Sequence, residues 1–197
     1  MVDTSGHIII VKKTGGAIDE DVIIIREDLR PELYTQILEI AEIEVLSTPI
    51  TFLWPTNSKV ITQAFGINPQ WYEKWGLPGH EGLDMRAYLG TPIVAAFGGE
   101  VVGNWKGTAY GWAVKIKATI RGDEYEAAYA HMQSQSKLVV GQKIGRGDYI
   151  GPADSTGNST GSHLHFMLKK KGATASGETN FPKDIIDPTN FFAELRD

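Results

Sequence analysis

The 197-residue chain contains no cysteine. Disulfides and thiolate metal ligands are therefore excluded, and any bound metal must be held by histidine and carboxylate side chains. The chain also lacks a long hydrophobic run, so no stretch is long enough to span a membrane as a helix. Basic residues are fewer than acidic ones, so the net charge is −5 and the pI is near 5.5. This balance argues against a nucleic-acid-binding protein, which usually carries a basic patch.

The N-terminal residues do not have the layout of a secretory signal peptide. Their apolar run, residues 8–11, is too short for a signal core, and Lys12 and Lys13 follow it rather than precede it. We therefore expect no signal peptide in this chain. The protein is then a phage-encoded product, an export substrate of another route, or a piece of a longer protein.

Residues 1–48 differ in texture from the rest and predict a short α+β segment of unknown role. Two β-branched runs, 8–11 and 22–25, flank a glycine-containing turn and predict a hairpin, and 29–43 have helical periodicity. From residue 49 to 197 the chain is rich in short strands and glycine turns. This pattern predicts an all-β domain, a compact antiparallel sheet or sandwich. The expected strands include 60–65, 110–117, 124–131 and 163–168.

Two stretches, 66–79 and 103–111, are expected to be long loops that wall a narrow groove. The first contains Trp71, Tyr72 and Trp75, which serve either as loop anchors or as part of a substrate-binding wall. The sequence leaves both interpretations open.

The most informative stretch is the segment 156–168, which begins as a turn and continues as the strand His-Leu-His-Phe-Met-Leu. Alternation along a strand places His163 and His165 on one face, and Leu164, Phe166 and Leu168 on the other, core-facing side. Two adjacent imidazoles on one face suit metal binding or catalysis better than packing.

Other candidate residues lie upstream. His80 and Asp84 are evenly spaced in a glycine-rich segment that is unsuited to a His-Glu-x-x-His zinc helix, so both side chains can face one side of an extended chain. His131 stands at the end of a predicted strand, where it is either part of a site lined by loops or a partly buried structural histidine.

Four fragments follow one another along the chain, and their order is informative. They are His80-x-x-x-Asp84, Tyr129-Ala130-His131, a glycine-rich turn at 141–147, and the segment around His163-Leu164-His165-Phe166. This ordered set, over roughly residues 55–192, resembles the lysostaphin/LytM family of zinc metallopeptidases, which cut peptide bonds in bacterial peptidoglycan. The run at 90–95 is also similar to the sequence after that family's aspartate.

The resemblance implies one Zn²⁺ per chain, held by His80, Asp84 and His165, with His131 and His163 as unligated catalytic histidines. It implies a zinc metalloendopeptidase in which zinc-activated water is the nucleophile, with the two histidines assisting and their division of labour open. Three protein ligands leave one zinc position free, as catalytic sites require. The implied substrate is the peptide part of peptidoglycan, either stem peptide or cross-bridge.

The chain departs from the family at Met167, where a glutamate is frequent, and in the turn at 151–155. The alternatives are a non-catalytic activator of wall hydrolases or scaffold of the same fold, and a sugar-binding β-domain with chance histidines. We further expect action at the bacterial cell wall, a partner from a phage or from the cell-wall machinery, and no nucleic-acid partner.

Overall fold

A computed structural model describes residues 9–12, 21–24 and 49–195. Contacts divide the chain into two compact units, Met1–Ile50 and Thr51–Asp197. In the first unit, β1 (Ile9–Lys12) and β2 (Asp21–Ile24) pair antiparallel, as the two β-branched runs predict. The predicted helix at 29–43 lies outside the described residues, and the domain boundary expected at 48/49 stays a prediction.

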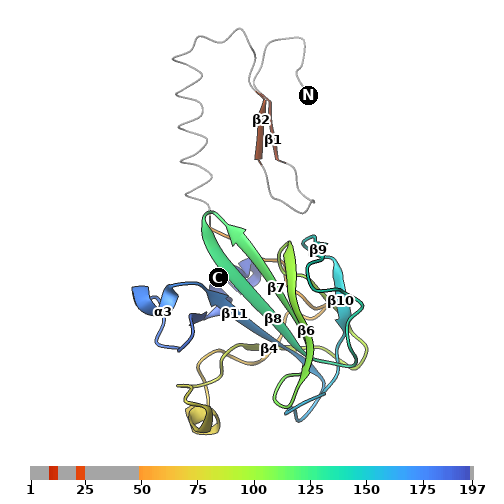
Figure 1. Ribbon diagram of the computed structural model, residues 1–197, viewed down its shortest axis with the longest axis vertical. Coiled ribbons are helices and arrows are strands. Elements are labelled where there is room, and N and C mark those ends of the chain that lie inside the picture. The colour runs from red at the N-terminus through yellow and green to blue at the C-terminus, as the bar shows by residue number, and fades with distance from the viewer. Residues whose placement is uncertain (1–8, 13–20, 25–48, 196–197) are drawn as a thin grey trace. The chain divides into compact units, whose positions relative to one another are not determined.

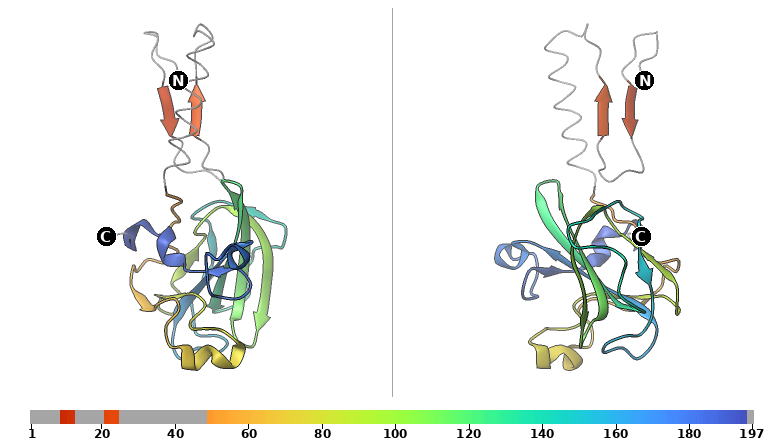
Figure 2. Two further views of the ribbon diagram at one scale, coloured as in Figure 1. Left: turned by 90° about the vertical axis from the view of Figure 1, so that its left-hand side faces the viewer. Right: turned by 45° about the vertical axis from the view of Figure 1, so that its right-hand side comes forward.

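The second unit is built on an eight-stranded sheet, which Figures 1 and 2 show from three sides. Its hydrogen-bonded path runs β3-β4-β11-β8-β7-β6-β9, and β12 pairs with β11. Each pair of neighbouring strands in this sheet is antiparallel, so the all-β expectation is confirmed. The strands are β3 (Ile61–Gln63), β4 (Leu83–Arg86), β6 (Gly99–Gly107), β7 (Gly111–Ile120), β8 (Asp123–Met132), β9 (Lys143–Ile144), β11 (His163–Lys170) and β12 (Ile185–Ile186).

A smaller sheet and a few helical turns complete the unit. The strands β5 (Pro92–Val94) and β10 (Tyr149–Pro152) pair antiparallel with a register shift. Short turns of helix close the C-terminal part: α3 (Ala173–Ser176), η2 (Pro188–Phe191) and η3 (Ala193–Leu195). None of the described helices is long and apolar enough to cross a membrane.

The core lies on one face of the large sheet, as the alternation in β11 predicts. Leu164, Phe166 and Leu168 are fully buried there, among aromatic rings from the chain ends. Phe166 packs edge-on against Tyr129 of β8 and against Phe192 after η2. Burial of these large side chains supplies the main driving force for the fold, at roughly 1.5–3 kcal/mol each.

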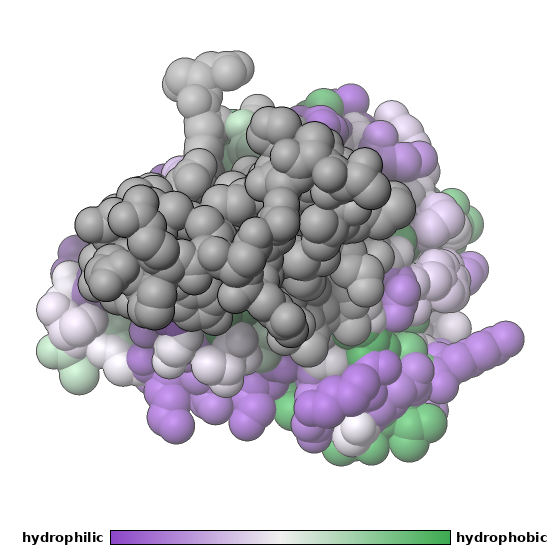
Figure 3. All heavy atoms as spheres, turned by 90° about the horizontal axis from the view of Figure 1, so that it is seen from above, coloured by the Kyte–Doolittle hydropathy of each residue, from purple (hydrophilic) through white to green (hydrophobic). Residues whose placement is uncertain are grey.

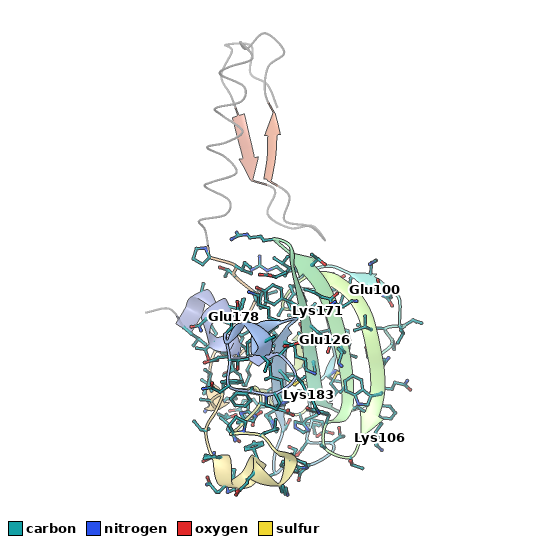
Figure 4. All side chains as sticks on the ribbon, turned by 60° about the vertical axis from the view of Figure 1, so that its left-hand side comes forward. Glu100, Lys106, Glu126, Lys171, Glu178 and Lys183 are labelled. Carbon is teal, nitrogen blue, oxygen red and sulfur yellow. The ribbon has the colours of Figure 1, made fainter. Side chains whose placement is uncertain are left out.

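The opposite face of the sheet carries the candidate site and then changes character along β11. After His165 comes Met167, which lies opposite Ala128 of β8 and is covered together with it by Phe181 and Ile185. Farther along, the same face is polar. In Figure 4, Glu126, Lys171 and Lys183 lie beside β8 and β11. Glu126 forms an ion pair with Lys115 at 2.9 Å.

Two predicted loops differ from expectation. The stretch 66–79 contains helical turns, α2 (Pro69–Tyr72) and η1 (Glu73–Trp75). Pro69 at the first helical position favours such a turn, because its missing N–H needs no partner there. Residues 103–107 belong to β6, which continues past a register shift at Gly103, so the β6–β7 connection is short. The long loop expected at 103–111 was wrong.

Exposed large hydrophobic side chains are scattered over the second unit, and include Trp71, Trp75, Tyr88 and Leu89. From above, Figure 3 shows mostly hydrophilic described residues, with hydrophobic ones in small patches. Isolated apolar side chains of this kind are normal on a protein surface.

Replacing Tyr129 by phenylalanine should destabilise the fold by about 1–3 kcal/mol. The Tyr129 hydroxyl is fully buried and accepts a hydrogen bond from the backbone N–H of Ala96 at 2.8 Å. The phenylalanine variant keeps the ring and leaves that N–H without a partner. Urea unfolding measures the effect, and Tyr88→Phe, at an exposed tyrosine, is the control. Equal unfolding midpoints for the two variants would contradict this role of the hydroxyl.

Candidate metal centre and its histidines

Strand pairing brings Asp84 and His165 together. Asp84 of β4 lies directly opposite His165 of β11 in the antiparallel register, with Leu83 opposite Phe166 on the other face. Cross-strand neighbours have Cβ atoms about 4.5–5.5 Å apart, close enough for side chains to meet. His80 precedes β4 and joins them from the turn before the strand. All three residues are buried.

Three side-chain atoms converge to form a compact triangle. His80 Nε2 lies 3.0 Å from His165 Nδ1 and 3.2 Å from Asp84 Oδ1, and His165 Nδ1 lies 3.0 Å from Asp84 Oδ1. A tetrahedral zinc ion with ligands at about 2.0–2.1 Å separates its ligand atoms by about 3.3 Å. The triangle therefore has nearly the dimensions that such an ion requires.

The tautomer of His80 fits the same purpose. Its Nδ1–H donates to the carbonyl of Ala64 at 3.0 Å, so Nε2 carries the lone pair that faces Asp84 and His165. An imidazole whose other nitrogen is fixed by a backbone carbonyl is the usual arrangement of a metal-ligating histidine. Two acceptors, His80 Nε2 and the Asp84 carboxylate, thus point at one spot, which a cation would satisfy. These residues fit a divalent metal ion.

His131 is held at the end of β8 in an unusual backbone conformation. Its φ is +62°, which non-glycine residues rarely adopt, and the β7–β8 register shifts beside it. The backbone N–H of His131 donates to the carbonyl of Tyr110 at 2.8 Å, and its Nδ1–H donates to the carbonyl of Thr156 at 2.7 Å. The ring stands beside His163, with centroids 4.7 Å apart.

His163 is oriented in the same manner from the other side. Its Nδ1–H donates to the carbonyl of Gly161 at 2.7 Å, and its Nε2 lies 3.5 Å from Asp84 Oδ1. His131 and His163 therefore both have Nδ1 tied to a backbone carbonyl, and the Nε2 of His163 faces the Asp84 carboxylate. Of the four histidines, His163 is the least buried.

The loops that supply these carbonyls approach each other so closely that glycine is required. Gly111 and Gly157 both have positive φ, and a Cβ on Gly157 would lie 2.2 Å from the Gly111 nitrogen. Asn158 N–H also donates to the carbonyl of Ala109 at 2.8 Å. The turn between β6 and β7 and the turn before β11 thus form one block around His131.

The electrostatics of the site separate His131 from His163. Burial lowers the pKa of His131 to about 4, with help from the positive charge that His165 can carry. Burial also opposes protonation of His163, but the hydrogen bond and charge of Asp84 outweigh it and raise the His163 pKa. For Asp84, burial opposes ionisation, yet the hydrogen bonds from His163, His165 and His80 hold its pKa well below the usual range.

The structure brings Tyr72, which the sequence left open as a loop anchor or a groove wall, to the site, and it adds contacts that the sequence did not signal. Tyr72, from α2, lies with its ring 5.4 Å from that of His80, and burial together with the charge of Asp84 raises its pKa to about 12. Tyr110 donates a hydrogen bond to Glu81, and Thr156 supplies the carbonyl for His131. Only the aromatic richness of 66–79 pointed to Tyr72. No local pattern signalled the other contacts, which join residues 25 or more apart.

The fold and the buried His-Asp-His cluster define the class of β-sheet metallopeptidases. The sequence profile described as Peptidase family M23 matches residues 78–176, which is half of the chain. That range contains His80, Asp84, His131, His163 and His165. The chain belongs to peptidase family M23, and the resemblance seen in the sequence is confirmed.

Curated relatives match part of the chain. The chain is 35% identical over 119 residues to the peptidoglycan DD-endopeptidase ShyA of Vibrio cholerae, covering 59% of this chain and 26% of ShyA. It is 35% identical over 117 residues to the glycyl-glycine endopeptidase ALE-1 of Staphylococcus capitis, covering 58% of this chain and 30% of ALE-1. The chain thus spans less than a third of the length of either relative.

Solved structures agree on the fold. The antimicrobial peptidase lysostaphin from Staphylococcus simulans matches with a TM-score of 0.53 and 25% identity, over 69% of this chain and 50% of lysostaphin. A structure described as LytU matches with a TM-score of 0.51 and 27% identity, over 77% of this chain and 94% of that chain.

Replacing Gly82 by alanine should weaken metal binding without unfolding the protein. A Cβ on Gly82 would lie 2.5 Å from the Phe166 carbonyl oxygen and 2.9 Å from His165 Cε1, so the segment that carries His80 and Asp84 must shift relative to His165. Disturbing the orientation of a metal ligand typically lowers affinity about 10–100-fold. Zn²⁺ affinity measured by chelator competition tests this. Gly145→Ala is the control, because the contacts of its Cβ begin at 3.5 Å, and equal affinities in the two variants would contradict the prediction.

Proposed function

We propose that this chain is a zinc-dependent endopeptidase that hydrolyses peptide bonds of bacterial peptidoglycan. The observation that carries the proposal is the buried triangle of His80, Asp84 and His165, which stands beside two further histidines, His131 and His163, each with Nδ1 on a backbone carbonyl. Membership of family M23 and the names of the endopeptidase relatives support it. A binding protein of the same fold would have no need of all five side chains.

Zinc is proposed because of the ligand chemistry. Two imidazoles and one carboxylate, with no thiolate in the chain, form a three-residue set of the kind that catalytic zinc sites use. When bound, zinc acts as a Lewis acid towards a peptide carbonyl and lowers the pKa of water to about 7. His80 Nε2, Asp84 Oδ1 and His165 Nδ1 would hold it.

His131 and His163 are proposed to move the protons of the reaction. In each, Nδ1–H is fixed on a backbone carbonyl, so Nε2 can accept a proton from water or return one to the departing amine. Fixed imidazoles of this kind contribute roughly 10²–10⁴ in rate as general acids and bases. Both are proposed to act on the same reacting bond, because their ring centroids lie 4.7 Å apart.

The bond that is cleaved is proposed to lie in a stem peptide or a cross-bridge. ShyA is named a DD-endopeptidase and ALE-1 a glycyl-glycine endopeptidase, so relatives of similar identity differ in the bond they cut. We also propose residues 49–197 as the catalytic domain, acting at the cell wall with delivery by a phage or by cell-wall machinery.

Purified protein should contain about one zinc per chain and release new amine ends from purified peptidoglycan. Metal analysis and amine quantification measure both, and mass spectrometry of the fragments identifies the bond. His165→Ala should lose zinc and activity, because it removes one of the three proposed ligands. Zinc binding without cleavage of Gram-negative and Gram-positive walls would contradict the enzyme and favour a non-catalytic activator.

His131→Ala and His163→Ala should retain zinc and lose about 10²–10⁴ in the rate of peptidoglycan cleavage. Neither side chain belongs to the triangle, so metal content should match the wild type. The measurement pairs zinc content with initial rates for each variant. Full activity of His131→Ala would show that its proposed role is wrong.

A further inference from the structure

Tyr110 is a half-buried tyrosine in the β6–β7 turn that faces the candidate site. Its ring lies 5.8 Å from the His165 ring, tilted by 38°, and 6.4 Å from Trp105 in an edge-on arrangement. Its hydroxyl donates a hydrogen bond to Glu81 Oε1 and lies 3.8 Å from the sulfur of Met167. Met167 follows His165 on the same strand face.

The backbone of Tyr110 also holds the second part of the site. Its carbonyl accepts the N–H of His131, the residue with the strained positive φ. The next residue, Gly111, packs so closely against Thr156 that a Cβ on it would lie 2.3 Å from the Thr156 carbonyl oxygen. That carbonyl accepts the Nδ1–H of His131. One tyrosine therefore contacts a candidate metal ligand with its ring and a candidate proton carrier with its main chain.

Glu81 lies between two candidate ligands, His80 and Asp84, in the chain. The following Gly82 is pressed against β11 near His165, so this segment has little freedom to move. A hydrogen bond from Tyr110 to Glu81 consequently joins the ligand-bearing turn before β4 to the turn that positions His131. These two segments are 29 residues apart in the sequence.

We propose that Tyr110 and Glu81 form a positioning pair that fixes the metal-ligating geometry of this site. The inference rests on the metal site of the proposed function and assigns a new role within it. The pair is proposed to contact neither the metal nor the substrate. It acts by holding the His80–Asp84 segment and the His165 ring in the geometry that the triangle requires, as partners around metal ligands commonly do.

The test is the affinity of the purified protein for Zn²⁺, measured by competition with a chelator. Tyr110→Phe keeps the ring and the charge of Glu81 but removes the hydrogen bond. Glu81→Ala removes the acceptor, and Glu81→Gln removes the charge but keeps an acceptor. Tyr88→Phe, at an exposed tyrosine, is the matched control, and circular dichroism verifies that each variant is folded.

We expect Tyr110→Phe and Glu81→Ala each to weaken Zn²⁺ binding about 10-fold or more. The double variant should bind no more weakly than the weaker single one, because both changes break the same bond. Glu81→Gln should retain most of the affinity. Wild-type affinity in Tyr110→Phe, with loss in both Glu81 variants, would overturn the pair and leave only the charge of Glu81. Lower thermal stability with unchanged Zn²⁺ affinity would reduce the pair to a packing role and also overturn it.

These outcomes are separable from failure of the proposed function. If the wild type binds Zn²⁺ and cleaves peptidoglycan while all variants bind equally well, the positioning pair is wrong and the enzyme stands. If the variants bind Zn²⁺ more weakly but the wild type cleaves no peptidoglycan, the pair stands and the endopeptidase is wrong.

Discussion

The site depends on the register between β4 and β11. Antiparallel pairing sets Asp84 directly opposite His165 and, one position along, Leu83 opposite Phe166 on the other face. A slip of one residue would exchange the two faces, so that Phe166 left the core and His165 entered it. Burial of Leu164, Phe166 and Leu168 therefore stabilises the fold and the His-Asp pair at once. Hydrophobic packing and metal-site geometry are coupled through one hydrogen-bonded ladder.

A second set of constraints acts through backbone carbonyls. Those of Ala64, Thr156 and Gly161 each accept the Nδ1–H of a histidine, and each leaves the Nε2 of that ring facing the site. Because these carbonyls belong to different turns, the tautomers depend on how the turns pack. The contact between Gly111 and Gly157 tolerates no side chain, which explains why two glycines stand there. The rings are thus oriented by main-chain geometry.

The strand face that carries the histidines is divided along its length. Met167 and Ala128 are covered by Phe181 directly after His165, and charged residues follow beyond them. The sulfur of Met167 lies beside Tyr110, and the side chain is buried. A carboxylate near Tyr110 comes from Glu81, in the ligand-bearing segment. The neighbourhood of the site is therefore apolar on the β11 side and acidic on the β4 side.

The sequence by itself determined the all-β class, most strands of the large sheet and the shared face of His163 and His165. These follow from alternation and turn residues, which are local properties. The ordered fragments also pointed to His80, Asp84 and His131. Only the tertiary structure decided the contacts that join distant segments: Asp84 opposite His165, His131 on the carbonyl of Thr156, and Tyr110 on Glu81. The extension of β6 through 103–107 was likewise decided by its pairing with β7, because short glycine-containing stretches have weak local preferences.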